Sequence, residues 1–298
     1  MVNFRMSISG QARPPKKNRR DEAREHAKAM RAEQIKRDKR RRFFLRGGVG
    51  VGLLAVVAIV TLLIVNNVNA PAAPGPANMA SDGILLSSDG TTVSAAVASA
   101  QTADADPTAT DQTALADLAN IVIFVDYLCP ICGNFENTNG AQITEWVNAG
   151  NATVEIHPIS ILDRASSGTE YSTRAANAAA CVATYEPNVF LDFNAAMFAN
   201  QPAENTRGLT DDELVGIAES AGVTSTDLAS CISDQTYSGW VDASTQRALD
   251  GPIPNSDIEN VKGTPTVLVN GVSYTGSFTD AAAFEAFVTA QMTATPAE

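Results

Sequence analysis

The pattern of apolar and polar positions changes twice in the middle of the chain. Asn120 to Tyr127 is a continuous run of β-branched and aromatic residues, which is typical of a strand buried on both faces. From Asn134 to Asn148 apolar side chains recur at helical intervals, and Gly150 suits the end of a helix. Thr153 to Ile159 again has the pattern of a strand. We therefore predict a β-α-β unit with two parallel strands and a right-handed crossover.

A long stretch from Glu170 to Asp250 shows helical periodicity and no convincing strand pattern. Thr210 and Glu213 are spaced as a capping box at the start of one of these helices. We expect the helices Tyr171–Tyr185, Asn188–Ala199, Asp211–Ala221, Ser225–Ser233 and Ser238–Leu249. This predicts a helical insertion, which we place at residues 168–252.

Strand patterns return near the C-terminus. Pro265 to Val269 and Val272 to Thr275 flank the dipeptide Asn270-Gly271, a strong signal for a tight hairpin. A last helix is expected from Asp280 to Gln291.

An earlier hairpin is predicted where GILLSS and TTVSAA flank Asp89-Gly90. The segment from Ala95 to Asp117 is rich in Ala, Thr, Asp and Gln, and we do not expect it to be well ordered. The predicted fold class is therefore α/β, with a mixed central sheet flanked by helices, and the domain extends over residues 83–298.

The N-terminal region has a different pattern. Residues 47–65 form an uncharged apolar run that is just long enough to cross a bilayer as a helix. Residues 1–46 hold 16 of the 21 Lys and Arg and 5 of the 33 Asp and Glu, a balance of +11, which leaves 5 basic and 28 acidic residues, or −23, for the rest. The positive-inside rule then predicts a basic cytoplasmic tail, a transmembrane helix and an outer domain. Residues 66–82, rich in Ala, Pro and Gly, are predicted to be a flexible linker.

Two alternatives for this region stay open. Val68-Asn69-Ala70 is a passable cleavage site for a signal peptide, although Pro71 follows it and the apolar run is longer than usual. The basic tail could in principle bind nucleic acid. Because the acidic remainder would repel phosphate, we expect no nucleic-acid partner.

All four cysteines follow the apolar run, and two of them, Cys129 and Cys132, lie in the stretch DYLCPICGNFE. A zinc site would need four ligands, and His157 cannot complete the set, so we expect no metal and no other cofactor. We interpret His157 as an ordinary strand residue. An inert disulfide at a helix start and a redox-active pair are the remaining interpretations.

The position of Cys129 favours redox chemistry. It follows a buried strand and begins a helix, where free backbone N–H groups and the macrodipole stabilise a thiolate and lower its pKa. Pro130 suits the first helical position. Cys132 lies one turn along and faces inward, so it can attack a mixed disulfide and release the partner.

With VKGTPTVLVNG, Val261 to Gly271, the cysteine motif resembles the DsbA-like branch of the thioredoxin superfamily, most of all its membrane-anchored actinobacterial members. The resemblance extends over about Gly83 to Met292 and implies a thioredoxin fold with a helical insertion. It further implies that Cys129 is the attacking, substrate-linked cysteine and Cys132 its buried partner. Pro265 corresponds to the family's cis-proline, which lies against the active-site disulfide.

In such proteins a substrate peptide pairs as an added strand beside the residue that is Thr264 here, and we expect Pro130 and Ile131 to contact it as well. The sequence departs from the family at Ile123, where a glutamate is frequent. The nearest acid, Asp126, is interpreted as a strand-end residue. Ile131 replaces a histidine and offers the thiolate neither charge nor hydrogen bond. We therefore predict that the start of the helix stabilises the thiolate, in a weaker oxidant than a Cys-Pro-His-Cys protein.

Cys181 and Cys231 lie on two separate predicted helices of the insertion. We expect a structural disulfide between them, worth about 2–4 kcal/mol. Similar extra pairs occur in actinobacterial relatives. A second redox-active pair is the alternative.

The predicted protein is a membrane-anchored, extracytoplasmic thiol:disulfide oxidoreductase that introduces disulfide bonds into exported proteins with free thiols. The resemblance implies a membrane reoxidant of the DsbB or VKOR type. Two alternatives stay open. The protein could be a reductase or isomerase, because the direction depends on a reduction potential that a sequence does not give. It could also be a non-catalytic adaptor that binds exported peptides.

Overall fold

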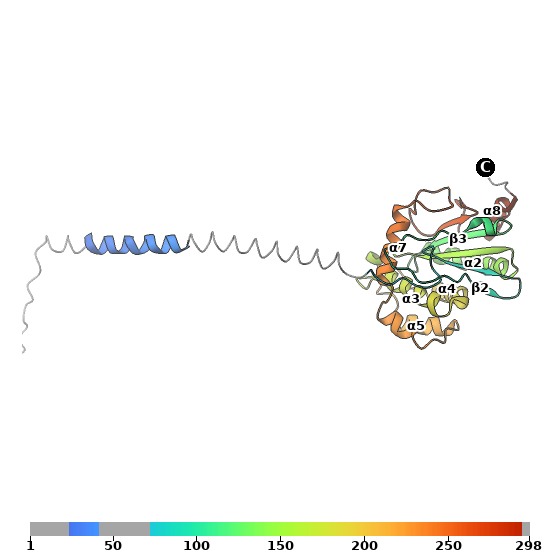
Figure 1. Ribbon diagram of the computed structural model, residues 1–298, viewed down its shortest axis with the longest axis horizontal. Coiled ribbons are helices and arrows are strands. Elements are labelled where there is room, and N and C mark those ends of the chain that lie inside the picture. The colour runs from blue at the N-terminus through green and yellow to red at the C-terminus, as the bar shows by residue number, and fades with distance from the viewer. Residues whose placement is uncertain (1–23, 42–71, 294–298) are drawn as a thin grey trace, which may run out of the picture. The chain divides into compact units, whose positions relative to one another are not determined.

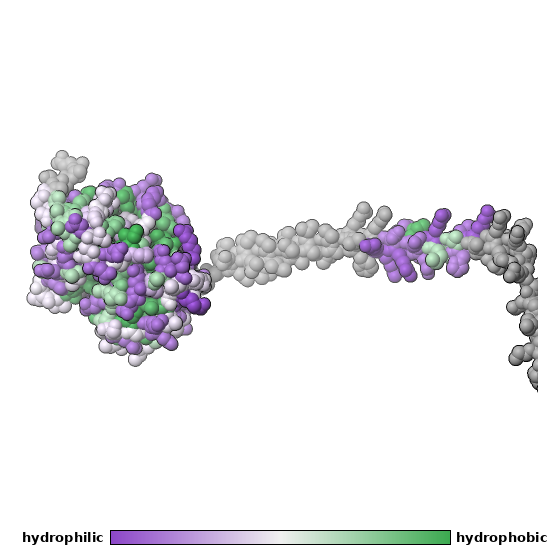
Figure 2. Space-filling view, turned by 180° about the vertical axis from the view of Figure 1, so that it is seen from behind, coloured by the Kyte–Doolittle hydropathy of each residue, from purple (hydrophilic) through white to green (hydrophobic). Residues whose placement is uncertain are grey.

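The computed structural model describes residues 24–41 and 72–293, which belong to two separate units. Residues 24–41 are helical, and Figure 2 shows this helix as mostly hydrophilic; its Met30 and Ile35 are each 57% exposed. The predicted membrane span, residues 47–65, lies outside the described residues. Among those that are described, no helix combines the length and the apolar character needed to cross a bilayer.

A six-stranded mixed sheet lies at the centre of the second unit (Figure 1). Its strands are β1 (Ile84–Ser88), β2 (Val93–Ala95), β3 (Ala119–Val125), β4 (Ala152–Pro158), β5 (Thr266–Val269) and β6 (Val272–Ser273), in the spatial order β2-β1-β4-β3-β5-β6. β3 and β4 are parallel, and every other neighbouring pair is antiparallel. The predicted β-α-β unit and both hairpins are confirmed.

The two faces of the sheet bury different side chains, because successive residues of a strand point to opposite faces. Ile121 and Ile123 of β3 belong to the main core, whereas Phe124 belongs to a smaller cluster with Leu268. Helices α2 (Pro130–Asn148) and α8 (Ala281–Thr293) meet in the main core through aromatic rings such as Phe135 and Phe284, whose centroids are 5.3 Å apart.

A block of helices follows β4, and Figure 1 shows α3, α4 and α5 together beside the sheet. Its helices are α3 (Tyr171–Tyr185), α4 (Phe190–Ala199), α5 (Asp211–Ser220), α6 (Leu228–Ser233) and α7 (Ser238–Asp250); short 3₁₀ turns lie at η1 (Gln112–Leu115), η2 (Asp163–Ala165) and η3 (Pro187–Val189). The predicted capping box is present, since Thr210 Oγ1 accepts from Glu213 N and Glu213 Oε2 accepts from Thr210 N. The helical insertion is confirmed.

The predicted linker comprises residues 66–82, and its described part, residues 72–82, is packed against the rest of the unit. Met79 is only 2% exposed, Ala77 N donates to Thr184 Oγ1 at 3.2 Å, and Asp82 pairs with Arg247 at 2.7 Å. The expectation of a flexible segment was therefore wrong for residues 72–82. Composition concealed this order because it comes from contacts with helices α3 and α7, which lie more than a hundred residues away in sequence.

The segment from Ala95 to Asp117 is also held in place, although it contains little regular structure. Thr102 forms an isolated β-bridge with Pro74, and Ala103 is only 6% exposed. Thr110 Oγ1 donates to the buried Glu155 at 2.9 Å. The two irregular segments therefore pair with each other and contact the sheet.

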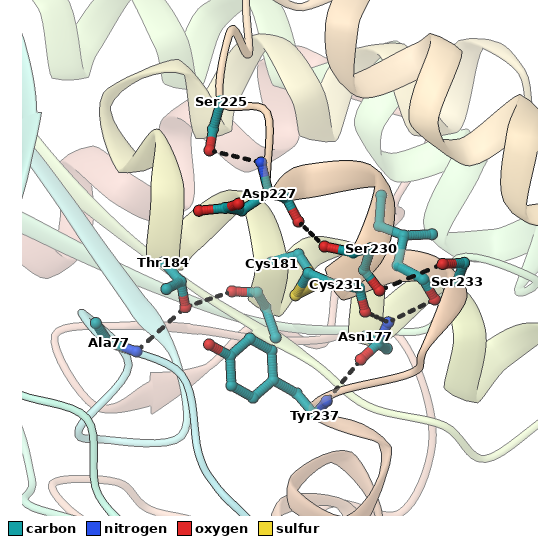
Figure 3. The surroundings of a disulfide bond; sticks show 12 residues. Ala77, Asn177, Cys181, Thr184, Ser225, Asp227, Ser230, Cys231, Ser233 and Tyr237 are labelled. Carbon is teal, nitrogen blue, oxygen red and sulfur yellow. Dashed lines mark hydrogen bonds between the residues drawn. A yellow bond between two sulfur atoms is a disulfide. The ribbon is translucent and has the colours of Figure 1, made fainter.

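The structure contains a disulfide between Cys181 of α3 and Cys231 of α6, with their Cα atoms 6.0 Å apart (Figure 3). Asn177 lies beside it, and its amide donates to the carbonyl oxygens of Cys231 and Ile232 at 3.4 Å. The Asn177 oxygen accepts from Tyr237 N at 2.8 Å. Covalent and hydrogen bonds thus join the first helix of the insertion to α6 and to the turn that follows it.

Candidate active site

Helix α2 begins directly after Cys129, just beyond the end of β3. Cys129 is the N-cap residue in an extended conformation, and Pro130 is the first helical residue. Gly133 N donates to the Cys129 carbonyl at 3.2 Å and closes the first turn. Cys129 is 5% exposed and the neighbouring Ile131 is 50% exposed. The reacting sulfur is therefore sheltered, and an apolar side chain lies in the open beside it.

The Cys129 thiol has a pKa lowered from 9.0 to about 6. The largest cause is a hydrogen bond with the Cys132 side chain, and desolvation opposes it. The backbone N–H groups of Cys132 and Ile131 lower the pKa further. The N–H groups at the start of the helix therefore lower the pKa of Cys129 in the predicted direction, and the Cys132 side chain, which was not predicted to do so, has the largest single effect.

Cys132 lies deeper than Cys129, with 1% of its surface exposed. Burial raises the pKa of Cys132 well above its ordinary value, and the neighbouring Cys129 raises it further. Both cysteines are free thiols in this structure. Near neutral pH the pair therefore holds one anionic sulfur and one protonated sulfur.

Pro265 lies opposite the cysteines, and the peptide bond between Thr264 and Pro265 is cis. The Cys129 sulfur lies 3.2 Å from the Thr264 carbonyl oxygen, to which it donates when it is protonated. The Thr264 hydroxyl oxygen is buried and has no hydrogen-bond partner in the part of the chain that the structure describes. Cys129, Cys132, Thr264 and Pro265 are thus brought to one site from sequence positions more than 130 residues apart.

Asp126 is fully buried three residues before Cys129. Its carboxylate accepts hydrogen bonds from the backbone N–H groups of Leu128, Ile161 and Leu162 at 2.8–3.0 Å, and from Ser172 Oγ at 2.8 Å. Burial raises the pKa of Asp126, and these hydrogen bonds oppose the increase. As a strand-end residue it ties the turn of residues 126–129, the active-site turn, to α3 and to the loop after β4.

Two more side chains of the insertion hold the active-site turn. Asn194 of α4 accepts from the Tyr127 hydroxyl at 3.1 Å. Gln201, just after α4, donates from Nε2 to the carbonyl oxygens of Tyr127 at 3.0 Å and Cys129 at 2.9 Å. With Ser172, three residues of the insertion therefore reach this turn. None of the three was predicted from the sequence.

A partly buried glutamate lies beyond the cysteines on helix α2. Glu136 is on α2, one turn beyond Cys132, and burial raises its pKa from 4.5 to about 7. Asn194 Nδ2 donates to its Oε2 at 3.1 Å. A Cβ atom at Gly140 would collide with its other oxygen. The signal for this group in the sequence was the unexplained glycine one turn later in the helix.

His157 lies apart from the cysteines on β4. Its ring stacks on Phe124 with centroids 4.4 Å apart, and its Nε2 lies 3.3 Å from Glu155 Oε1. A cavity of about 300 Å³ on this side is lined by His157, Phe124 and Leu268 among others, and by none of the four cysteines. Within residues 24–41 and 72–293, no cluster of His, Cys, Asp and Glu is arranged to hold a metal ion.

A mixed sheet with a helical insertion, a CxxC pair at a helix start and a cis-proline opposite it is the arrangement of DsbA-like thiol–disulfide oxidoreductases. The chain belongs to the thioredoxin family, since residues 116–290 match the family profile described as Thioredoxin.

Solved structures support the same class. The reduced DsbA of Mycobacterium tuberculosis is similar with a TM-score of 0.54 and 29% identity; the match covers 72% of this chain and 94% of that one. The reduced disulfide oxidoreductase DsbG of the same organism has the same TM-score and identity, with 72% and 89% coverage. Both likenesses extend over most of the second unit.

A different relative is longer than this chain. The serine/threonine-protein kinase PknE of Mycobacterium tuberculosis is 36% identical over 116 residues, which are 38% of this chain and 20% of the kinase. The chain thus matches only about a fifth of the length of its curated relatives.

Proposed function

We propose that this protein is a membrane-anchored, extracytoplasmic thiol:disulfide oxidoreductase that introduces disulfide bonds into exported proteins. The observation that carries the proposal is the difference between the two sulfurs. The Cys129 pKa is lowered to about 6, whereas burial raises that of Cys132. A stabilised thiolate favours the reduced pair, so the oxidised pair readily takes up electrons.

The reaction begins with an oxidised Cys129–Cys132 pair. A substrate thiolate attacks Cys129 Sγ, the bond between the two enzyme sulfurs breaks, and Cys132 leaves as a thiolate that takes up a proton. A second substrate thiolate then attacks the substrate sulfur of the mixed disulfide and releases Cys129 as a thiolate. Two substrate thiols become one disulfide, and two electrons remain on the enzyme pair.

Substrate recognition is assigned to the surface around Cys129. An extended peptide would pair with the backbone at Thr264, as a strand added beside the cis-proline. Pro130 and Ile131, which are both exposed, would contact its side chains. Main-chain pairing with an apolar neighbour selects unfolded peptides in general, which suits an enzyme with many substrates.

The location rests on the N-terminal sequence. We assign residues 1–46 to a basic cytoplasmic tail, residues 47–65 to a single span and the cysteine domain to the outer side, where disulfides persist. Since each cycle leaves the pair reduced, we also propose a membrane reoxidant of the DsbB or VKOR type.

The test is the reduction potential of the purified full-length chain, measured by equilibration with glutathione. We expect a potential clearly above that of thioredoxin, about −270 mV. A value near thioredoxin's would identify a reductase instead. Oxidative refolding of a reduced substrate should be lost in Cys129→Ser, because this change removes the sulfur that forms the mixed disulfide. A peptide-binding adaptor would not be affected by the change.

A further inference from the structure

We infer that Gln201 is a positioning residue for the cysteine pair, through which the helical insertion holds the backbone of Cys129 at the start of helix α2. The inference rests on the proposed function, since it concerns the same pair. Gln201 acts through the main chain of the active-site turn, by hydrogen bonds to two of its carbonyl oxygens.

The amide of Gln201 bonds twice within the active-site turn. Its Nε2 donates to the carbonyl oxygen of Tyr127 at 3.0 Å and to that of Cys129 at 2.9 Å. The Cys129 carbonyl also accepts the first helical hydrogen bond, from Gly133 N at 3.2 Å. The peptide unit that follows Cys129 is therefore fixed from two directions. The backbone N–H groups of Ile131 and Cys132 lower the Cys129 pKa. The orientation of this peptide unit determines how these two N–H groups point toward the sulfur.

Gly133 provides the space that this amide occupies. A Cβ atom at position 133 would collide with Gln201 Oε1. Glycine weakens a helix relative to alanine, so a buried glycine in the first turn of α2 has a cost that helix propensity does not explain. The close approach of Gln201 explains it. A local irregularity in the motif CPICG thus reflects a contact with a residue 68 positions later.

The segment that carries Gln201 is itself firmly held. Gln201 N donates to the carbonyl of Phe198 at 3.2 Å, and the Phe198 ring packs on Tyr127 with centroids 5.1 Å apart. Further along, Thr169 Oγ1 donates to the Arg207 carbonyl at 2.6 Å. The insertion therefore presents the amide from a fixed support, as a positioning role requires.

The other two residues of the insertion that reach this turn bond to its side chains and not to Cys129. Ser172 bonds to the Asp126 carboxylate, and Asn194 bonds to the Tyr127 hydroxyl. Gln201 is the member of this trio that contacts Cys129 itself. The effect on Cys129 should therefore be specific to it.

The first experiment compares Gln201→Met with the wild-type chain in its reduced, full-length form. Methionine has similar length but no donor, so both carbonyl bonds are lost. We expect the Cys129 pKa, measured by thiolate absorbance against pH, to rise by about half a unit to one unit. At a pH well below the pKa, the fraction of Cys129 that is thiolate then falls by about 3- to 10-fold. Reaction with a thiol-specific alkylating reagent at that pH should slow by the same factor.

Gln142 provides the matched control. It lies on α2, the helix that follows Cys129, and its Nε2 also donates twice, to Asn139 Oδ1 at 2.8 Å and to the Ala281 carbonyl at 3.3 Å. Gln142→Met should lower the unfolding temperature and leave the Cys129 pKa unchanged. If Gln201→Met does the same, Gln201 is merely structural and the inference is wrong.

A double-mutant cycle tests the link to Gly133. Gly133→Ala should raise the Cys129 pKa in the wild-type background, because the new methyl group displaces the amide. In a Gln201→Ala background the space is free, so the same change should leave the pKa unaltered. Equal effects in both backgrounds would overturn the inference. Gln201→Ala also replaces Gln201→Met in the pKa comparison if the methionine variant does not fold.

Failure of the proposed function would look different. An ordinary Cys129 pKa in the wild-type chain, or a potential near thioredoxin's, would remove the proposed oxidant. The inference about Gln201 is judged only by the differences between each variant and the wild type.

Discussion

The sulfur of Cys129 lies 3.2 Å from the carbonyl oxygen of Thr264, across 135 positions of sequence. This contact joins the start of helix α2 to the cis bond before Pro265. The helical insertion lies between these two segments in sequence and supports the first of them. Cys129 is therefore held at its sulfur by the Thr264–Pro265 turn and at its carbonyl oxygen by helix α2 and by the insertion.

The first prediction concerns the two cysteines. Because the hydrogen bond with Cys132 is the largest cause of the low Cys129 pKa, Cys132→Ala should raise that pKa from about 6 by about one unit or more. Cys132→Ser retains an O–H donor and is the matched control, with a smaller rise expected. Thiolate absorbance during a pH titration measures both. Equal pKa values in the two variants would contradict the assigned cause.

Local signals predicted much of this fold, because its elements are consistent with their own sequences. The bounds of α3 agree with the apolar periodicity, the Thr210 capping box is present, and Asn270-Gly271 joins β5 to β6. Each of these features depends on residues close together in the chain.

What the sequence concealed depends on distant contacts. No local pattern reveals that Gln201 bonds to Cys129 or that Met79 is buried, since each partner lies far away in the chain. Glycines at positions 133 and 140 were the available signs, because helix propensity alone disfavours them. Their meaning becomes clear only once the side chains of Gln201 and Glu136 are located.

The second prediction concerns Glu136 and pH. Its pKa is raised from 4.5 to about 7 by burial, so between these values the folded protein binds more protons than the unfolded chain. Stability should therefore decrease as pH rises through this window. Glu136→Gln removes the ionisable group. The free energy of unfolding of this variant minus that of the wild type should therefore be larger at pH 8 than at pH 4.5, by about 1–3 kcal/mol.

Urea unfolding at both pH values measures this difference. Glu145→Gln is the control, since Glu145 is an exposed glutamate of the same helix. A pH dependence that is the same in wild type and Glu136→Gln would show that Glu136 titrates normally.

The third prediction concerns the disulfide of the insertion. Replacing Cys181 and Cys231 together by alanine should lower the free energy of unfolding by about 2–4 kcal/mol, because a long loop of the unfolded chain is no longer closed. The reduction potential of the Cys129–Cys132 pair should stay unchanged, since the disulfide lies among buried side chains of α3 and α6. A shift in that potential would favour the interpretation of Cys181 and Cys231 as a second redox pair.

The last prediction concerns the segment before β1. Met79 is 2% exposed and lies in the main core, so Met79→Ala should cost about 2–5 kcal/mol of unfolding free energy by leaving a cavity. Met292, on the last helix, is 40% exposed, and Met292→Ala should change stability by about 0.5 kcal/mol or less. Denaturant unfolding of both variants measures the difference. Similar small effects would mean that residues 72–82 behave as a tether after all, whereas a large effect at Met79 alone places this segment within the cooperative fold.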